Sequence, residues 1–261
     1  MEGSRGLGDV YKRQDEGYGR MSSPEAILES LSNEVEKNEL DGIRILVSAG
    51  PTREPIDPVR FISNYSSGKM GYALAESARN LGADVELISG PVCIKMPENI
   101  KITSVETSGE MLDAVLGKIP YCDVFISAAA ISDYRPSHKL TEKHKSSDGE
   151  LVIRLERGED ILKLAKETKA GLYAVGFSAE TNNISDNAKI KLEKKNIDMI
   201  ISNEANHQKG LGFESDMNEV CIIEKDSMLK IPKNTKKIIA DIILSRIATV
   251  SYTHLRAHET L

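Results

Sequence analysis

The chain has 261 residues, of which 40% are hydrophobic and 28% charged, a composition typical of a globular protein. Its formal net charge of −6 argues against a general nucleic-acid-binding protein, so an anionic ligand needs a local cluster of positive charge. No apolar run approaches the roughly 20 residues of a membrane-spanning helix, and no signal peptide opens the chain. Cys93, Cys122 and Cys221 follow neither disulfide-framework nor zinc spacing, which favours a reducing cytoplasm.

The two ends of the chain differ from the rest of it. Residues 1–14 and 251–261 follow no periodic pattern and connect abruptly to what adjoins them, so we expect non-native or disordered tails without chemistry. Residues 25–38 place apolar side chains on one helical face, and a polar linker follows. Residues 43–250 are expected to form one domain.

Strand-like and helix-like segments alternate from Ile43 onward. β-branched and apolar runs predict strands at 43–48, 84–89, 101–105, 122–128, 151–156, 172–177, 198–202 and 219–224. Apolar residues at helical spacing predict helices at 68–82, 108–118, 160–169, 183–196 and 234–248. This alternation predicts an α/β fold, a Rossmann-like and mostly parallel sheet with helices on both faces. Ligands of such sheets bind outside the carboxyl ends of the strands.

Two later regions predict additional β structure. Residues 135–157 contain a polar, lysine-rich stretch followed by an alternating strand, and residues 212–232 suggest a hairpin with its turn at Asp226-Ser227. We expect both pieces to form a β extension of the domain that serves as a dimer contact and a mobile flap.

The most informative segment joins the first predicted strand to the first predicted helix. A Gly-Pro turn and three prolines hold it extended. Hydroxyl groups and backbone N–H groups at the start of the helix, beside Lys69, form a site for an anion such as phosphate; they belong to Ser66, Ser67 and Gly68. Asn64 lies neither at the cap nor at an apolar position, which favours a working side chain, and Arg60 could pair with a carboxylate or phosphate. The alternative is a stiffened loop whose serines only cap a helix.

A second candidate lies at the end of the strand predicted over 122–128. Small residues from Ser127 to Ala130 let backbone approach a ligand closely, and Asp133 could hold Mg²⁺. The alternative is a small-residue strand packed under a helix, with Asp133 as a helix or turn cap.

Two lysine patterns form the remaining candidates. Lys139, Lys143 and Lys145 could close over phosphates as a lid, or could be solvated surface. Lys191 and Lys195 project from one side of a predicted helix, where a solvated face is the alternative. Phe177, at a strand end, could stack on a base or belong to the core. Together with the first two candidates, these features suit triphosphate chemistry with pyrophosphate as the leaving group.

Four long motifs carry a resemblance to a known family. They run from Gly50 to Asn64 (GPTREPIDPVRFISN), from Ser66 to Gly71 (SSGKMG), from Ala129 to Arg135 (AAISDYR) and from Val175 to Asn183 (VGFSAETNN). With them, residues 43–248 resemble phosphopantothenoylcysteine synthetase of coenzyme A biosynthesis, in its bacterial, CTP-dependent form.

A second resemblance lies upstream. Residues 15–25 look like the last turn-and-helix region of phosphopantothenoylcysteine decarboxylase, the flavin domain fused before the synthetase in most bacteria. Residues 15–42 would then be a decarboxylase remnant with its linker, and FMN and decarboxylation would belong to a domain that this chain lacks. The alternative is an unrelated glycine-rich leader.

The resemblance implies a ligase. The family joins 4′-phosphopantothenate to L-cysteine: CTP activates the carboxylate as an acyl-cytidylate, pyrophosphate leaves, and the cysteine amine then displaces CMP. Mg²⁺ is the expected cofactor and a homodimer the expected assembly, with no nucleic-acid or membrane partner.

The resemblance also implies residue roles. Asn64 would handle the acyl-cytidylate, and Lys143 is the flap lysine. Arg60 and the Ser66–Gly68 amides would hold substrate carboxylate or phosphate, and Asp133 would bind CTP and Mg²⁺. Further nucleotide contacts are implied at Ser127, Ala128, Ala129, Glu159, Asp160, Ile161, Leu162, Phe177, Lys191 and Lys195. The sequence departs from the family pattern at His144 and Ser146, where more basic residues are usual, and at Glu159, where proline is common.

Two other functions remain open at this point. An NAD(P)-dependent oxidoreductase would share the architecture, but the first turn reads Ser-Ala-Gly-Pro-Thr-Arg and not GxGxxG. An inactive nucleotide-binding fragment is the third possibility, because fold alone does not define function.

Overall fold

The structure is a computed structural model that describes residues 38–145, 149–180, 184–204 and 215–254. The chain divides into two compact units, Met1–Glu36 and Lys37–Leu261, and every structural statement below concerns the second. The expectations for residues 1–14 and for most of 15–42 lie outside the described residues.

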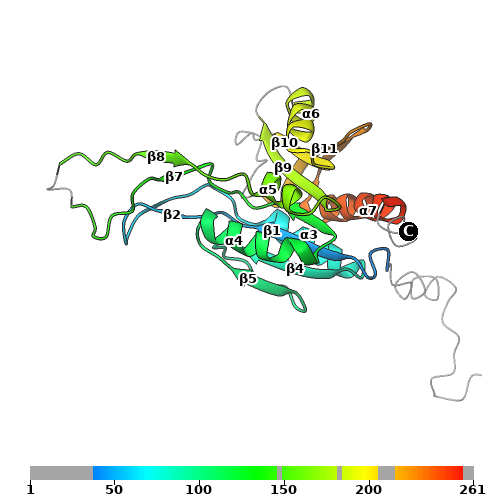
Figure 1. The fold of residues 1–261 in the computed structure, drawn as a ribbon. Coiled ribbons are helices and arrows are strands. Elements are labelled where there is room, and N and C mark those ends of the chain that lie inside the picture. The colour runs from blue at the N-terminus through cyan, green and yellow to red at the C-terminus, as the bar shows by residue number, and fades with distance from the viewer. Residues whose placement is uncertain (1–37, 146–148, 181–183, 205–214, 255–261) are drawn as a thin grey trace, which may run out of the picture. The chain divides into compact units, whose positions relative to one another are not determined.

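An eight-stranded sheet forms the centre of this unit, in the order β12-β11-β10-β9-β6-β1-β4-β5 (Figure 1). Six strands run parallel, namely β1 (Arg44–Ala49), β4 (Asp84–Ser89), β5 (Lys101–Ser104), β6 (Val124–Ser127), β9 (Tyr173–Glu180) and β10 (Met199–Glu204). β11 (Met217–Glu224) and β12 (Met228–Thr235) continue the sheet in antiparallel pairing. The predicted α/β fold with a mostly parallel sheet is confirmed.

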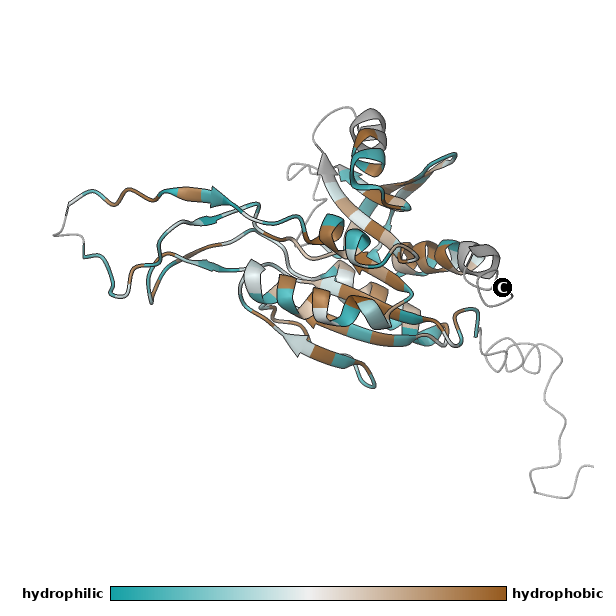
Figure 2. Ribbon diagram, viewed as in Figure 1, coloured by the Kyte–Doolittle hydropathy of each residue, from teal (hydrophilic) through white to brown (hydrophobic). Residues whose placement is uncertain are grey.

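Helices cover both faces of the sheet. α3 (Lys69–Asn80) and α7 (Lys236–His254) pack on one face, and α4 (Ser108–Lys118), α5 (Ile161–Thr168) and α6 (Ile184–Lys195) on the other, with a short 3-10 helix at Ile119–Tyr121. Strand β1 shows why both faces need cover: Ile45 and Val47 belong to the α3/α7 core, and Leu46 belongs to the α4/α5/α6 core. Its near-continuous apolar run is therefore buried on both sides, as expected of a central parallel strand. In Figure 2 hydrophobic residues, drawn brown, recur along the strands of the sheet and the helices that cover it.

Most predicted elements are confirmed within two residues of their bounds. Helix α4 and strand β4 match the prediction residue for residue, whereas α7 continues to His254, into the segment expected to be a tail. The strand expected at 151–156 appears only as β8 (Leu155–Arg157), which pairs with β7 (Tyr134–Pro136) outside the main sheet. All three β8 residues are exposed, so no buried face extends the pairing.

The extension predicted at 212–232 is wrong for its described residues. These form β11 and β12 within the main sheet, because Val220, Ile222 and Ile231 bury their side chains in the α3/α7 core.

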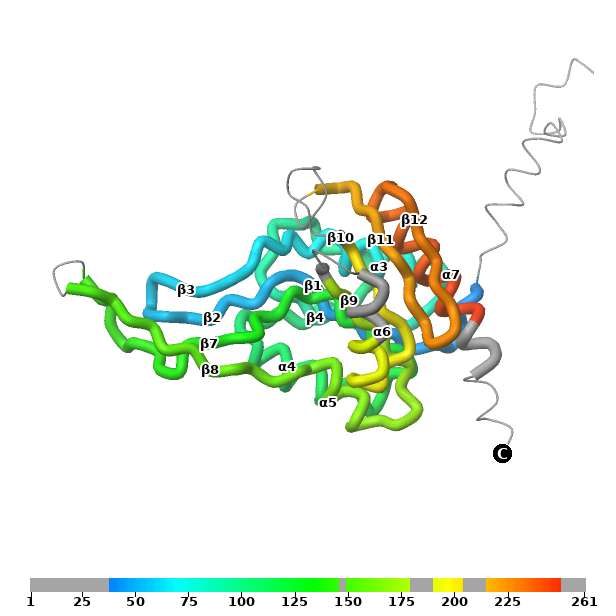
Figure 3. The backbone as a smooth tube through the Cα atoms, turned by 90° about the horizontal axis from the view of Figure 1, so that it is seen from above, coloured from blue at the N-terminus to red at the C-terminus, as the bar shows by residue number. Residues whose placement is uncertain are grey.

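The β structure near 135–157 does leave the main sheet. β7 and β8 lie beside the hairpin of β2 (Glu54–Pro55) and β3 (Phe61–Ile62), as Figures 1 and 3 show. We call residues 53–62 together with 134–145 and 149–157 the arm. Both parts of the arm follow carboxyl ends of central strands, β1 and β6, so the arm adjoins the edge at which a ligand is expected.

Candidate functional site

The centre of the candidate site is the topological switch point of the sheet. On one side of this point the strands that follow β1 are added towards one edge, and on the other side the strands that follow β6 are added towards the opposite edge. β1 and β6 are neighbours, but α3 leads from β1 to β4 on one side, and α5 leads from β8 to β9 on the other. Open α/β sheets bind ligands at such a switch point, outside the carboxyl ends of the strands.

Backbone hydrogen bonds join the two loops that leave this point. Ala128 N donates to Ser48 O at 3.1 Å, and Ala130 N donates to Gly50 O at 2.8 Å. Thr52 N donates back to Ala130 O at 3.3 Å. The structure thus brings the predicted nucleotide-contact segment, Ser127 to Ala129, against the loop between β1 and α3 (residues 50–68), which we call the opening loop.

The start of α3 lies directly on the end of β1. A Cβ atom added to Gly71 would come within 2.5 Å of Ala49 Cβ, so only glycine permits this approach. Gly68 is the N-cap residue and has φ 79°. It has no side chain that could cap the helix, and the first turn contains no acidic residue. The positive end of the helix dipole is therefore directed to the switch point, where it favours an anion.

Asn64 ties this helix start to the β6 loop. Its Nδ2 donates to Ala130 O, and its Oδ1 accepts from Ser66 N at 3.0 Å. Ser66 Oγ in turn accepts from Gly68 N at 3.3 Å. One N–H and one lone pair of the Asn64 amide remain after these two bonds. The side chain therefore shapes the loop and still has a donor for a ligand.

Arg60 is engaged by the protein itself. Its Nε and Nη2 contact Asp57 Oδ2 at 2.8 and 2.5 Å, and Nη2 also donates to His144 O at 3.0 Å. The Asp57 side chain has no exposed surface, and the hydrogen bonds from Arg60 lower its carboxyl pKa to about 2. Nε and Nη2 are occupied by these contacts, so Arg60 could bind substrate, as expected from the sequence, only through Nη1.

Asp133 and Lys143 are both exposed. Within the described residues the Asp133 carboxylate has no hydrogen bond or ion pair, so it is not the helix or turn cap of the alternative prediction. Asp133 O accepts from Gly158 N at 2.8 Å, which brings the segment from Glu159 to Leu162 next to it.

That segment opens α5. Asp160 caps the helix by accepting from Lys163 N at 3.2 Å, and its Oδ2 lies 2.8 Å from Lys195 Nζ. The structure thus brings together two of the predicted nucleotide contacts. Ile161 and Leu162, by contrast, are 3% and 7% exposed and belong to the core. Their predicted contact with a nucleotide can involve only backbone atoms, because their side chains are buried in the core.

Phe177 is not brought together with Lys191 and Lys195. It is half-buried against the α3/α7 core, whereas Lys195 meets Asp160 on the opposite face of the sheet. A ligand that contacts all three would have to lie across the carboxyl edge.

Several charged residues at this edge make contacts that sequence analysis did not predict. Glu54 is 3% exposed, and its Oε1 accepts from Ser108 N at the start of α4 at 2.9 Å. Lys69 Nζ lies 2.6 Å from Asp216 Oδ1. Lys236, the first residue of α7, is buried, and burial together with the nearby charge of Lys69 lowers its pKa to about 8. Glu54 and Asp57 could have been found as acidic residues between the prolines of the opening loop. Nothing in the sequence indicated that Lys236 would be buried.

Asp133 is the residue expected to hold Mg²⁺. Among the described residues no group of three or more His, Cys, Asp or Glu side chains could hold a metal ion. Because Mg²⁺ commonly binds through one or two carboxylates plus substrate phosphates, the exposed carboxylate of Asp133, which has no partner among the described residues, would fit that mode.

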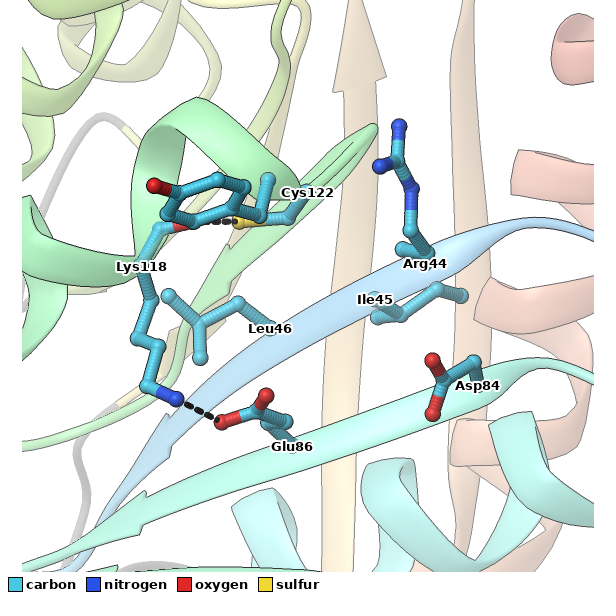
Figure 4. A pocket seen from close by; sticks show the side chains of 8 residues that line it. Arg44, Ile45, Leu46, Asp84, Glu86, Lys118 and Cys122 are labelled. Carbon is cyan, nitrogen blue, oxygen red and sulfur yellow. Dashed lines mark hydrogen bonds and ion pairs between the residues drawn. The ribbon is translucent and has the colours of Figure 1, made fainter.

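A cavity of about 170 Å³ lies at the opposite, amino-terminal edge of the sheet (Figure 4). Its wall includes Lys118, whose Nζ lies 2.7 Å from Glu86 Oε2, and Cys122, whose Sγ donates to Lys118 O at 3.1 Å. Burial raises the pKa of the Cys122 thiol to about 11, so it stays protonated and unreactive. This cavity shares no residue with the candidate site.

The sheet order, the glycine-dependent seating of α3 and the two joined loops define an α/β protein of the Rossmann-like class. In the described residues no helix is long and apolar enough to cross a membrane.

Comparison with known proteins gives the family. A model described as "DNA/pantothenate metabolism flavoprotein C-terminal domain" matches residues 40–250, and the chain belongs to this family. It is 39% identical over 251 residues to the coenzyme A biosynthesis bifunctional protein CoaBC of Vibrio vulnificus, covering 95% of this chain and 61% of that protein. For CoaBC of Bacillus subtilis the identity is 41% over 240 residues, covering 90% and 59%.

A solved structure gives the same result. The crystal structure of the C-terminal domain of CoaBC superposes with a TM-score of 0.71 at 42% identity, covering 83% of this chain and 99% of that one. The resemblance to the synthetase family is confirmed. The chain spans about three fifths of the length of the two curated relatives.

Proposed function

We propose that this chain ligates 4′-phosphopantothenate to L-cysteine, with CTP as the activating nucleotide, and so acts as a phosphopantothenate–cysteine ligase of coenzyme A biosynthesis. The similarity at 42% identity to 99% of the solved CoaBC C-terminal domain carries this proposal. The geometry supports it, because the anion-binding start of α3 and the β6 loop meet at the switch point.

Two bond exchanges make up the reaction. A substrate carboxylate oxygen attacks the α-phosphorus of CTP, and the bond to pyrophosphate breaks. The cysteine amine then attacks the acyl carbon, CMP leaves with its oxygen, and the amine loses a proton. Activation is needed because a carboxylate does not react with an amine until its oxygen becomes a leaving group.

The residues around β1 would serve the acyl substrate. The α3 start and the Ser66–Gly68 backbone would bind its negative charge. The remaining N–H of Asn64 would donate to the carboxylate and then to the acyl oxygen. This hydrogen bond orients the reacting carbon between the two joined loops.

The residues beyond β6 would serve the nucleotide. Backbone from Ser127 to Ala129 would contact CTP, and Lys143 and Lys195 would stabilise the phosphate charge that builds up as pyrophosphate leaves. Asp133 would hold Mg²⁺, which supplies Lewis-acid stabilisation of the phosphates when bound.

One assay tests the proposal. Purified protein is mixed with 4′-phosphopantothenate, cysteine, Mg²⁺ and either CTP or ATP, and pyrophosphate and 4′-phosphopantothenoylcysteine are measured. We expect product with CTP. A folded sample that forms no product with either nucleotide would be the inactive fragment and would refute the ligase. Lys191→Ala is expected to weaken CTP binding with the fold intact; unchanged affinity would remove Lys191 from the site.

We propose in addition that the chain forms a homodimer through the arm. Val59, Phe61, Val152 and Leu155 of the arm are 61%, 48%, 74% and 48% exposed, and such an exposed apolar group favours a protein contact. Sedimentation should give a dimer that Val152→Asp weakens. Tyr121→Asp is the control, because Tyr121 is also exposed, at 69%, but lies at the amino-terminal edge. A monomeric wild type would contradict this assembly.

A cytoplasmic location completes the proposal. Cys93, Cys122 and Cys221 are all free thiols, which fits a reducing compartment.

A further inference from the structure

The segment that carries Lys143 is attached to the opening loop on both sides of that lysine. Leu140 N donates to Ile56 O at 2.9 Å, and His144 O accepts from Arg60 Nη2 at 3.0 Å. We call residues 138–145 the lysine segment. The Lys143 side chain is exposed, so these two hydrogen bonds, both made by backbone groups of the segment, hold the position from which it projects.

Arg60 can make its bond because Asp57 holds the guanidinium. Asp57 Oδ2 accepts from both Nε and Nη2 of Arg60, while Oδ1 accepts from Val59 N at 2.8 Å and from Arg60 N at 2.9 Å. The carboxylate is thus fixed by its own backbone and fixes the guanidinium in turn. An arginine held in this way loses less rotamer entropy when it bonds a third group than a free side chain would lose.

The hydrogen bond to His144 crosses a long stretch of sequence. Asp57 and Arg60 belong to the turn between β2 and β3, and His144 lies 84 positions beyond Arg60. Arg60 also leads directly through β3 to Asn64. One buried carboxylate is therefore connected to both halves of the candidate site.

We propose that Asp57 is a positioning residue: it holds Arg60 so that Nη2 binds the His144 carbonyl and sets the lysine segment, with Lys143, over the nucleotide phosphates. The role of Lys143 in this statement rests on the proposed ligase function. The attachment of the lysine segment to Arg60 is independent of that function and can be measured without substrate.

The test compares three variants of the full chain. Asp57→Asn removes the negative charge that holds the guanidinium, and Arg60→Lys removes the planar fork and keeps a positive charge. Glu156→Gln is the matched control, because Glu156 pairs with Arg135 on the same arm at 2.9 Å but both side chains are exposed. Hydrogen exchange of the backbone amides is measured in ligand-free protein, and pyrophosphate release is measured at saturating CTP.

We expect exchange at residues 139–145, above all at the Leu140 amide, to rise at least tenfold in Asp57→Asn and Arg60→Lys and to stay unchanged in Glu156→Gln. Exchange in β1 should not change, which would show that the fold is intact. Pyrophosphate release should fall by about 10- to 100-fold, as expected when a catalytic group is misplaced by about 1 Å, with CTP affinity within about threefold.

Unchanged exchange in the lysine segment of both folded variants would overturn the proposal. If Asp57→Asn also raises hydrogen exchange in β1, its fold is disturbed, and the result for Arg60→Lys alone tests the proposal. Faster exchange confined to the lysine segment, in a protein whose wild type forms no product, would support the positioning role and refute the ligase. Normal pyrophosphate release from a variant whose segment exchanges faster would refute the link to Lys143.

Discussion

Replacing Gly71 with alanine tests how α3 is seated at the candidate site. Gly71 lies in the first turn of α3, against the last residue of β1. The added Cβ would meet Ala49 Cβ at 2.5 Å, Ala49 Cα at 3.1 Å and Ser48 O at 3.2 Å. Carbon atoms pack best at about 3.5–4.0 Å, so the helix start has to withdraw by about 1 Å or the strand end has to move.

The magnitude follows from two opposing effects. Overpacking of this kind costs about 1–3 kcal/mol, and the better helix propensity of alanine returns at most about 1 kcal/mol. We expect a net loss of about 1–2 kcal/mol, which lowers the Tm of a domain of this size by roughly 3–6 °C.

Gly117→Ala is the matched control. Gly117 lies in α4, and a Cβ added there meets nothing within 4 Å. The same chemical change should therefore raise stability by about 0.5 kcal/mol through the lower entropy of the unfolded chain.

Thermal unfolding followed by circular dichroism measures both variants. The KM for 4′-phosphopantothenate reports the displacement of the α3 start, and it should rise in Gly71→Ala and stay unchanged in Gly117→Ala. A Gly71→Ala protein with the Tm and KM of the control would refute the seating of α3 on β1, and with it the anion site as described.

Three further predictions concern single charges at the carboxyl edge. The folded pKa of Lys236 is lowered from 10.5 to about 8, so the unfolded chain keeps a proton that the folded protein has lost; stability should rise between pH 8 and 10 by up to about 3 kcal/mol. Lys236→Met should abolish this rise in denaturant unfolding. Asp133→Asn should raise the Mg²⁺ concentration for half-maximal activity by roughly tenfold without changing Tm, because Asp133 is exposed. Lys195→Ala should break the ion pair with Asp160 and raise the CTP Kd, measured by calorimetry, by about tenfold.

Each of these has a clear contrary result. Equal alkaline stability of wild type and Lys236→Met would show that this lysine is not the titrating group. An unchanged Mg²⁺ requirement would remove Asp133 from the metal, and unchanged CTP affinity in Lys195→Ala would leave the ion pair a purely structural contact.

Local pattern was enough for most of the secondary structure. The spacing of apolar residues depends on the geometry of each element alone, which is why β4 and α4 were predicted with their observed bounds. Long motifs likewise indicated the family and the candidate site, since three of the four contain or directly follow the carboxyl ends of β1, β6 and β9.

Tertiary structure decided how each of these pieces is used. The hairpin predicted at residues 212–232 was expected to be an extension, but its described strands, β11 and β12, join the main sheet. The partner that buries Ile222 and Ile231 there is α7, which follows them in the chain. Ile161 and Leu162 match the family pattern, yet their side chains fill the core. Asp57 and Arg60 are three residues apart in the sequence, but what Arg60 holds lies 84 residues further along. Burial and long-range pairing depend on which segments the fold brings together, and no local pattern of residues contains that information.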